Sequence, residues 1–130
     1  MILGIGTDLV AVARMAAALE RRGSALAERL LHPEEFFLWQ NASQQAAWLA
    51  KRFAAKEALL KALGTGLAQG ISWRHMAVLP NALGRPEVVW HGAAKAYLQA
   101  LSQGAVVKTH LSITDEAEYA LAFAVIESSA

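Results

Sequence analysis

The chain has 130 residues, of which 55% are hydrophobic and 18% charged, with no cysteine and a formal net charge of +1. This apolar content excludes a disordered chain, and the near-zero charge argues against wholesale nucleic-acid binding. Without cysteine there are no disulfides and no thiolate chemistry. No apolar run approaches the roughly 20 residues of a membrane span, and the N-terminus lacks a signal-peptide pattern. We therefore expect one domain over residues 1–130, in the cytoplasm and without a membrane partner.

The N-terminal segment MILGIGTD predicts a short buried strand that ends near Thr7 and Asp8. Gly4 and Gly6 permit a bulge or a close backbone approach. They do not form a dinucleotide fingerprint, because the third glycine and the downstream acid are missing. Two roles stay open for Asp8, which are the N-cap of the following helix and a functional carboxylate at the strand end.

A basic helical region is predicted over residues 10–31, with a break near Gly23. Its arginines outnumber its acids, and they are Arg14, Arg21, Arg22 and Arg29. Such residues form either a solvated helical face or a docking surface for an acidic partner, where charge complementarity raises the association rate.

The strongest helix prediction lies in the stretch from Trp48 to Gly66, with Ser43 as a candidate N-cap and Gly64 as the left-handed residue that ends the helix. Glu57 and Lys61 are i,i+4 neighbours beside the apolar stripe of this helix. They form either an exposed ion pair of little consequence or part of a functional site. The glycine-rich residues 64–66 that follow are a candidate phosphate-binding nest.

Further elements complete an α+β pattern. A helix starts at His32, and His75 and His91 are interpreted as structural. The remaining expected elements are strands over 75–79 and 86–90 joined by a turn at 80–85, a helix over 91–101, and strands over 105–114 and 119–126. The later strands can pair antiparallel, and the long helix is expected to pack against that sheet.

With the segments laid out, the chain resembles the holo-acyl-carrier-protein synthases, the small bacterial type of 4′-phosphopantetheinyl transferase. Three segments carry the resemblance: GIGTD at 4–8 with Arg14; KRFAAKEA at 51–58, continuing through Lys61 to GTG at 64–66; and HLSIT at 110–114. The Gly84-Arg85-Pro86 turn also matches. A departure is Asp115, where many relatives carry histidine, so Asp115 is given no catalytic role.

The resemblance implies a compact phosphopantetheinyl transferase fold and a homotrimer with active sites at subunit boundaries. The implied reaction moves 4′-phosphopantetheine from coenzyme A to a serine of apo acyl carrier protein, with Mg²⁺, and releases adenosine 3′,5′-bisphosphate. It would support fatty acid biosynthesis. No nucleic acid is expected as a partner.

The resemblance also implies roles for individual residues. Asp8 and Glu57 would hold Mg²⁺ and act in catalysis together with Lys61. The coenzyme contacts would be Arg52, Lys61, Gly64, Thr65, His110, Ser112 and Thr114. Arg14, Arg21, Arg22 and Arg29 would dock the carrier protein. The group that removes the serine proton stays open, with a metal-bound water as one option and Glu57 helping.

The sequence leaves two other classes of function open. One is a different metal-dependent phosphoryl or phosphodiester enzyme that uses the same carboxylates. The other is a non-catalytic trimeric protein that binds the carrier. The reaction products distinguish the first, and magnesium-dependent turnover with coenzyme A excludes the second.

Overall fold

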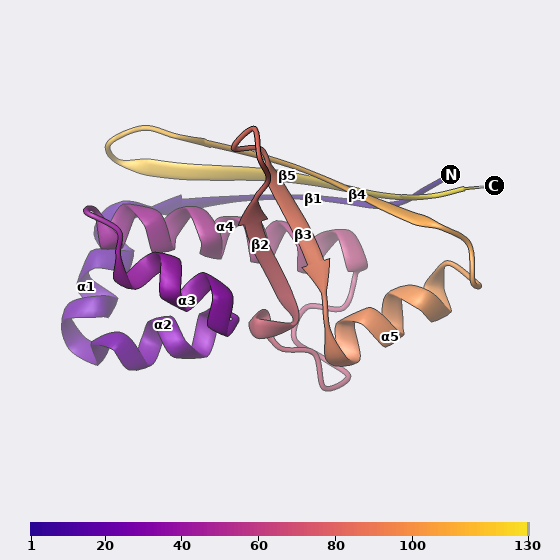
Figure 1. The fold of residues 1–130 in the computed structure, drawn as a ribbon, viewed down its shortest axis with the longest axis horizontal. Helices are drawn as coiled ribbons and strands as arrows, with labels where there is room; N and C mark the ends of the chain where they lie inside the picture. Colours follow the sequence, from indigo (N-terminus) through magenta and orange to yellow (C-terminus); the bar gives the residue numbers. More distant parts are fainter. Residues whose placement is uncertain (130) are drawn as a thin grey trace.

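The computed structural model describes residues 1–129 and has the expected α+β architecture (Figure 1). The elements in chain order are β1 (Ile2–Ala11), α1 (Val12–Arg22), α2 (Ser24–Leu30), α3 (Pro33–Gln40), α4 (Gln45–Leu63), a 3₁₀ turn η1 (Trp73–His75), β2 (Met76–Pro80), β3 (Pro86–Trp90), α5 (Gly92–Leu101), β4 (Val107–Asp115) and β5 (Tyr119–Ser128). In Figure 1, α1, α2 and α3 gather at one end of the molecule and α5 lies at the other, near both termini.

An antiparallel sheet in the order β1-β5-β4 lies along α4, as the sequence predicts for the long helix. Alternate residues of β5 face the helix and are fully buried, namely Ala120, Ala122, Ala124 and Ile126. Three of these four side chains are methyl groups, so the helix can lie close to the sheet. Much of α4 is buried in turn, because it packs on the sheet along one side and on α1, α3 and β2 elsewhere.

The two glycines of β1 lie where this helix approaches most closely. A Cβ atom on Gly4 would lie 1.8 Å from the carbonyl oxygen of Ala62, and one on Gly6 would lie 2.0 Å from that of Ala58. Neither distance is compatible with a side chain, so the close backbone approach predicted for these glycines is confirmed.

The predicted end of the first strand is wrong. β1 continues to Ala11, which pairs with Tyr119, so Asp8 lies within the strand opposite Ala122. The N-cap of α1 is Ala11, without a side-chain hydrogen bond, which rules out the capping role for Asp8. The polar pair Thr7 and Asp8 was misleading as an end signal, because pairing with β5 carries β1 past them through the apolar residues Leu9 and Val10.

The ends of α4 agree with the prediction at one terminus only. Gly64 adopts the left-handed conformation (φ 81°) and ends the helix, as expected. At the start, Gln44 rather than Ser43 is the N-cap, and no side chain caps it. Here Gln45 binds the carbonyl oxygens of Trp39 and Gln40 instead, so packing against α3 fixes where the helix begins.

A separate hairpin of β2 and β3 crosses over α4 (Figure 1). Its turn falls at residues 80–85 as predicted. Asn81 closes it, because its side-chain oxygen accepts hydrogen bonds from the backbone N–H groups of Leu83 and Arg85. Within residues 1–129, no helix has the length and apolar character needed to cross a membrane.

Candidate active site

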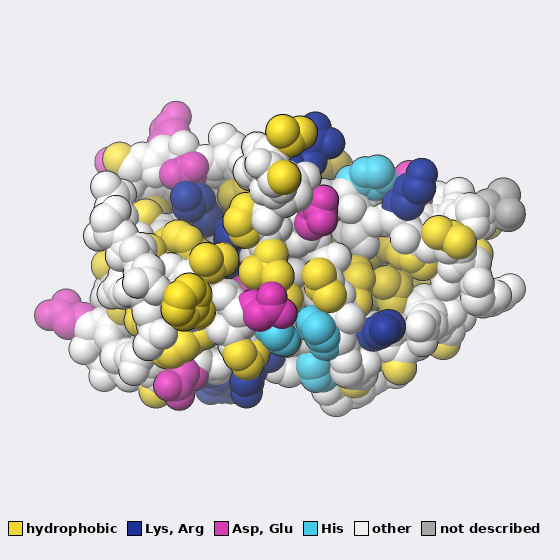
Figure 2. Space-filling view, viewed as in Figure 1, with side chains coloured by type: hydrophobic (Ala, Val, Ile, Leu, Met, Phe, Trp, Pro, Cys, Tyr) yellow, Lys and Arg dark blue, Asp and Glu magenta, His cyan; other side chains and the backbone are white. Residues whose placement is uncertain are grey.

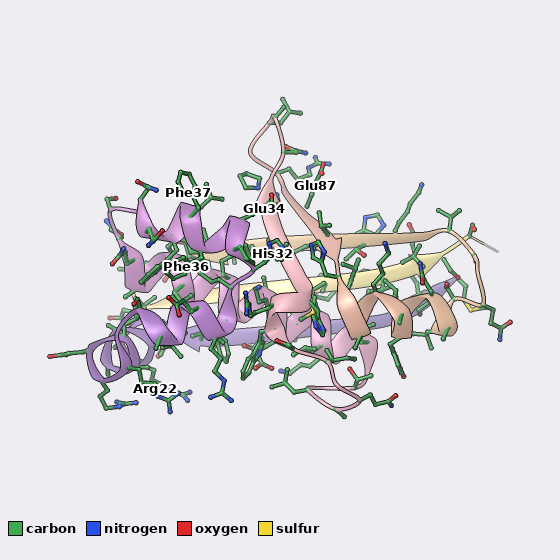
Figure 3. All side chains as sticks on the ribbon, turned by 60° about the horizontal axis from the view of Figure 1, so that its bottom comes forward. Arg22, His32, Glu34, Phe36, Phe37 and Glu87 are labelled. Atoms are coloured by element: carbon green, nitrogen blue, oxygen red, sulfur yellow. The ribbon has the colours of Figure 1, made fainter. Side chains whose placement is uncertain are left out.

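The most informative depression is a cavity of about 530 Å³ between β1, α1 and α4. Asp8 reaches it from β1 and Glu57 from α4. The α1 arginines Arg14, Arg21 and Arg22 also line it, and Figure 3 marks Arg22 at the end of α1. Residues from two distant parts of the sequence, 8–22 and α4, which are predicted to act together, therefore line one cavity.

Lys61 ties the two main elements of this site together. Its ammonium group donates to the Asp8 carboxylate at 3.1 Å and to the backbone oxygen of Thr7 at 2.8 Å. The Lys61 side chain is 55% exposed, whereas that of Asp8 is only 19% exposed. The ammonium group is therefore held beside the carboxylate but remains accessible to an anionic ligand.

Glu57 is held differently. The indole N–H of Trp73, in η1, donates to its Oε1 at 3.3 Å. Sequence reasoning missed Trp73, because a single tryptophan in a loop, sixteen positions after Glu57, carries no spacing signal. Its position depends on how the 64–72 loop returns to α4.

The donor set of this cavity suits a hard divalent cation. Asp8 and Glu57 supply carboxylate oxygens, and no cluster of three or more histidine, aspartate or glutamate side chains with metal-binding geometry occurs among residues 1–129. Zinc sites usually need three or four protein ligands, whereas Mg²⁺ keeps several waters and takes one or two carboxylates plus substrate phosphates. Two carboxylates on an open cavity therefore fit Mg²⁺.

The predicted phosphate nest lies at the end of α4. Gly64 and Gly66 both have positive φ, 81° and 58°. The N–H of Gly64 is already used, since it donates to the carbonyl oxygens of Leu60 and Lys61. The nest prediction therefore depends on Thr65 and Gly66.

The predicted coenzyme contacts on β4 face away from Asp8. Register places Thr7 opposite Phe123, and Phe123 opposite Ser112, so these residues share the outer face of the sheet. His110 and Thr114 lie on that same face, and Asp8 lies on the inner face. Within one chain, the β4 residues and the metal-binding candidates are thus on opposite sides of the sheet.

His110 borders a second depression, of about 720 Å³, between β4 and the hairpin. Arg85, Pro86 and Ser112 also line it, and Figure 2 shows hydrophobic side chains at the bottom of a hollow between the hairpin and β4. The ring of His110 pairs with Glu127 at 2.8 Å, and this hydrogen bond lowers the pKa of the Glu127 carboxyl.

Arg52 borders a third depression, of about 430 Å³, together with Lys51 and Asp115. Only 12% of its side chain is exposed. Its guanidinium lies 4.3 Å from the ring centroid of Trp48, and its Nε has no hydrogen-bond partner within residues 1–129. Burial lowers the pKa of Arg52. Arg52, His110 and Asp8 therefore border three separate depressions of one chain.

A buried ion pair lies behind the site and was not expected. Glu35 and Lys56 are both fully buried, and the Lys56 ammonium donates to Glu35 at 2.5 Å. Backbone N–H groups of His32 and Val78 also donate to this carboxylate. Burial lowers the pKa of Lys56 to about 8, and the attraction of Glu35 opposes that shift. Lys56 follows Leu49 by seven residues, so its place on the apolar side of α4 was a signal that could have been used.

A model of the 4′-phosphopantetheinyl transferase superfamily matches residues 4–124. The holo-[acyl-carrier-protein] synthase of Halorhodospira halophila is 47% identical over 126 residues, which cover 97% of this chain and 98% of that protein. The crystal structure of the synthase from Neisseria meningitidis superposes with a TM-score of 0.89 at 41% identity, covering 98% of this chain and all of that one. A Bacillus anthracis synthase in complex with coenzyme A has a TM-score of 0.80 at 31% identity, with 99% of each chain covered.

Proposed function

Because the chain belongs to the 4′-phosphopantetheinyl transferase superfamily, we propose that it transfers 4′-phosphopantetheine from coenzyme A to a serine of apo acyl carrier protein. Adenosine 3′,5′-bisphosphate is the second product. The observation that carries the proposal is the cavity that Asp8 and Glu57 both line, with Lys61 bound to Asp8 and three arginines of α1 in the same lining. The modified carrier would serve fatty acid biosynthesis.

In this proposal Asp8 and Glu57 hold Mg²⁺, which supplies charge neutralisation at the pyrophosphate of coenzyme A. Transfer of a phosphoryl group depends mainly on positioning and electrostatic stabilisation. Lys61 provides a second positive charge, fixed by its bonds to Asp8 and Thr7. The accessible side of its ammonium group can bind a phosphate oxygen and stabilise the leaving phosphate.

We also propose a homotrimer, for which the resemblance supplies the threefold number. The outer face of the sheet is apolar and exposed, with Ile5 61%, Leu9 59%, Phe123 45% and Leu121 37% exposed. A contiguous exposed apolar surface of this kind is typical of a protein interface. Association through this face would also bring His110 of one subunit toward another subunit. Depressions that are separate within one chain could then be joined across the subunit boundary.

The proposal is tested with purified apo acyl carrier protein, coenzyme A and Mg²⁺. We expect the mass of the carrier to increase by one phosphopantetheine group at its serine, with release of adenosine 3′,5′-bisphosphate in equal amount. A different phosphorylated product would favour another phosphoryl-transfer enzyme. Binding of the carrier without any turnover would favour a non-catalytic binding protein.

A further inference from the structure

We infer that Trp73 is a positioning residue, which orients the Glu57 carboxylate for a divalent cation. The inference rests on the proposed function for the identity of the cation. An indole N–H is a donor only, so Trp73 cannot itself bind a cation and acts through Glu57. The hydrogen bond is 3.3 Å long and uses Oε1 of Glu57. Within residues 1–129 this is the one hydrogen bond to the Glu57 carboxylate, so Oε2 stays free for a ligand.

The backbone of Trp73 is held by the buried ion pair. Lys56 donates to the carbonyl oxygen of Trp73 at 2.9 Å and to Glu35. Lys56 and Glu57 are consecutive residues of α4, and both bind Trp73, one through the backbone oxygen and the other through the indole. Trp73 is thus fixed to the helix at two points, which sets the direction of its N–H group.

The ring of Trp73 is packed as well. The Phe53 ring centroid lies 6.1 Å from that of Trp73, and the Arg29 guanidinium lies 5.6 Å from its ring centroid. Arg29 contacts Trp73 and is absent from the lining of the cavity that Arg14, Arg21 and Arg22 share. Arg29 therefore packs on the ring of Trp73, apart from the three arginines that line the cavity.

These contacts matter because a carboxylate that binds a metal without a second hydrogen bond can rotate. Groups that hydrogen-bond metal ligands orient them, and removing such a group typically weakens metal binding about 10- to 100-fold. Trp73 contacts Lys56 and Phe53 of α4 and Arg29 of α2. These contacts fix the direction of its hydrogen bond to one carboxylate oxygen of Glu57. Its effect should therefore appear in metal affinity, and the binding of the carrier protein should not change.

The first experiment compares Trp73→Phe with Trp39→Phe. Both substitutions remove one indole hydrogen bond and keep an aromatic ring, and Trp39 donates to the Gln45 carbonyl oxygen at 3.1 Å, away from the cavity. The probe is Mn²⁺ titrated into each protein with coenzyme A present, with free Mn²⁺ measured by electron paramagnetic resonance. We expect Trp73→Phe to weaken Mn²⁺ binding about 10-fold and Trp39→Phe to leave it unchanged. An affinity within about twofold of the wild type for Trp73→Phe would overturn the inference.

Kinetics supply an independent measurement. Trp73→Phe should raise the KM for Mg²⁺ by a similar factor, and kcat should recover at saturating Mg²⁺, because the ligand remains and only its orientation is lost. A reduced kcat that saturating Mg²⁺ does not restore contradicts a positioning role.

The experiments also distinguish a failure of the proposed function from a failure of the positioning role, and they allow for a variant that does not fold. Wild-type protein that binds Mn²⁺ more tightly than Trp73→Phe but does not modify the carrier refutes the proposed function and keeps the positioning role. If Trp73→Phe does not fold, the indole N–H signals of the wild type are assigned by nuclear magnetic resonance from single replacements of the other tryptophans. The Trp73 signal should then shift most when Mg²⁺ is added, and an unchanged Trp73 signal overturns the inference.

Discussion

Gly6 packs directly against the carbonyl oxygen of Ala58, which a Cβ atom on Gly6 would approach to 2.0 Å. Asp8 lies two residues further along β1, and Glu57 immediately precedes Ala58 on α4. The contact therefore sets the separation of β1 from α4, and through it the separation of the two carboxylates that border the cavity.

Gly6→Ala should move β1 away from α4. Overpacking of this kind costs about 1–3 kcal/mol of unfolding free energy, and we expect turnover to fall with it because the carboxylates move apart. Urea denaturation and carrier modification measure the two effects. Gly104→Ala is the control, since Gly104 has a positive φ with open space around it. It should cost about 1–2 kcal/mol for the left-handed backbone and leave turnover of the folded protein intact.

The glycines illustrate what the sequence could predict. Their close approach, the long helix ending at Gly64 and the antiparallel C-terminal strands follow from local chemistry and patterning, and the structure has all three. The end of β1 was mispredicted, because it depends on pairing with residues more than a hundred positions away. Asp8 consequently lies within a strand and not at its end.

The residues of the candidate site also include some that the sequence could predict and some that it could not. Asp8, Glu57 and Lys61 could be named from motif resemblance; Asp8 and Glu57 line one cavity, and Lys61 binds Asp8. Trp73 and Glu35 could not, because the fold alone brings Trp73 to Glu57 and Glu35 to Lys56, and neither pair has a characteristic spacing in the sequence. The separation of His110 from Asp8 by the sheet was equally invisible before the register of β4 and β5 was known.

Lys61→Gln should abolish most turnover without unfolding the protein. The side chain is largely exposed, so its removal leaves little cavity, but it takes away the positive charge fixed beside Asp8. Loss of one preorganised electrostatic group typically lowers kcat about 10²- to 10³-fold. Steady-state kinetics and the melting temperature measure the effects. Near-normal kcat in a folded Lys61→Gln protein would show that this ammonium group has no part in the reaction.

Arg21→Ala should weaken carrier docking more than Arg29→Ala does. Arg21 lines the cavity with Asp8, whereas Arg29 lies over Trp73. Charges at the edge of an interface mainly alter association rate and salt dependence. We therefore expect Arg21→Ala to raise the KM for the carrier at low salt and to flatten its salt dependence, with the KM for coenzyme A nearly unchanged. An unaltered carrier KM at low salt would make Arg21 a solvated surface residue.

Acid should destabilise the fold through a group of histidines near the base of the hairpin (Figure 2; His32 is labelled in Figure 3). The rings of His32 and His91 stack with centroids 4.5 Å apart. Burial lowers the pKa of His32 and that of His75, and His91 lowers both further, although Glu34 and Glu35 oppose the shift at His32. An unfolded histidine titrates near pH 6.5. The unfolded chain therefore binds more protons below that pH, and stability falls as pH drops through 6.5 toward the lower folded values.

His32→Asn tests this histidine group. Asparagine can replace His32 as the N-cap of α3, where the ring nitrogen accepts from Glu34 N–H, but it does not titrate. Urea midpoints measured between pH 7.5 and 5.5 should fall less steeply in the variant than in the wild type. Equal slopes in the variant and the wild type would contradict the assignment.

Phe123→Glu should prevent the proposed association. Phe123 lies on the outer face of the central strand between Thr7 and Ser112, and a carboxylate there would be buried without a partner in any interface through this face. Sedimentation should show a monomer, and turnover should be lost although the melt remains cooperative. A fully active monomer would refute both the trimer and the shared site.

A mixing experiment separates shared sites from association alone. Glu57→Gln removes a proposed metal ligand on the inner side of the sheet, and His110→Ala removes a candidate coenzyme contact on its outer face. If each site takes Glu57 from one subunit and His110 from another, trimers reassembled from the two inactive variants contain some sites with both residues intact. We expect these mixtures to regain part of the wild-type turnover, whereas each variant reassembled alone does not. Mixtures that associate but stay inactive would mean that each chain supplies both residues to its own site, and the opposite orientation of Asp8 and His110 would then need a rearrangement of β4.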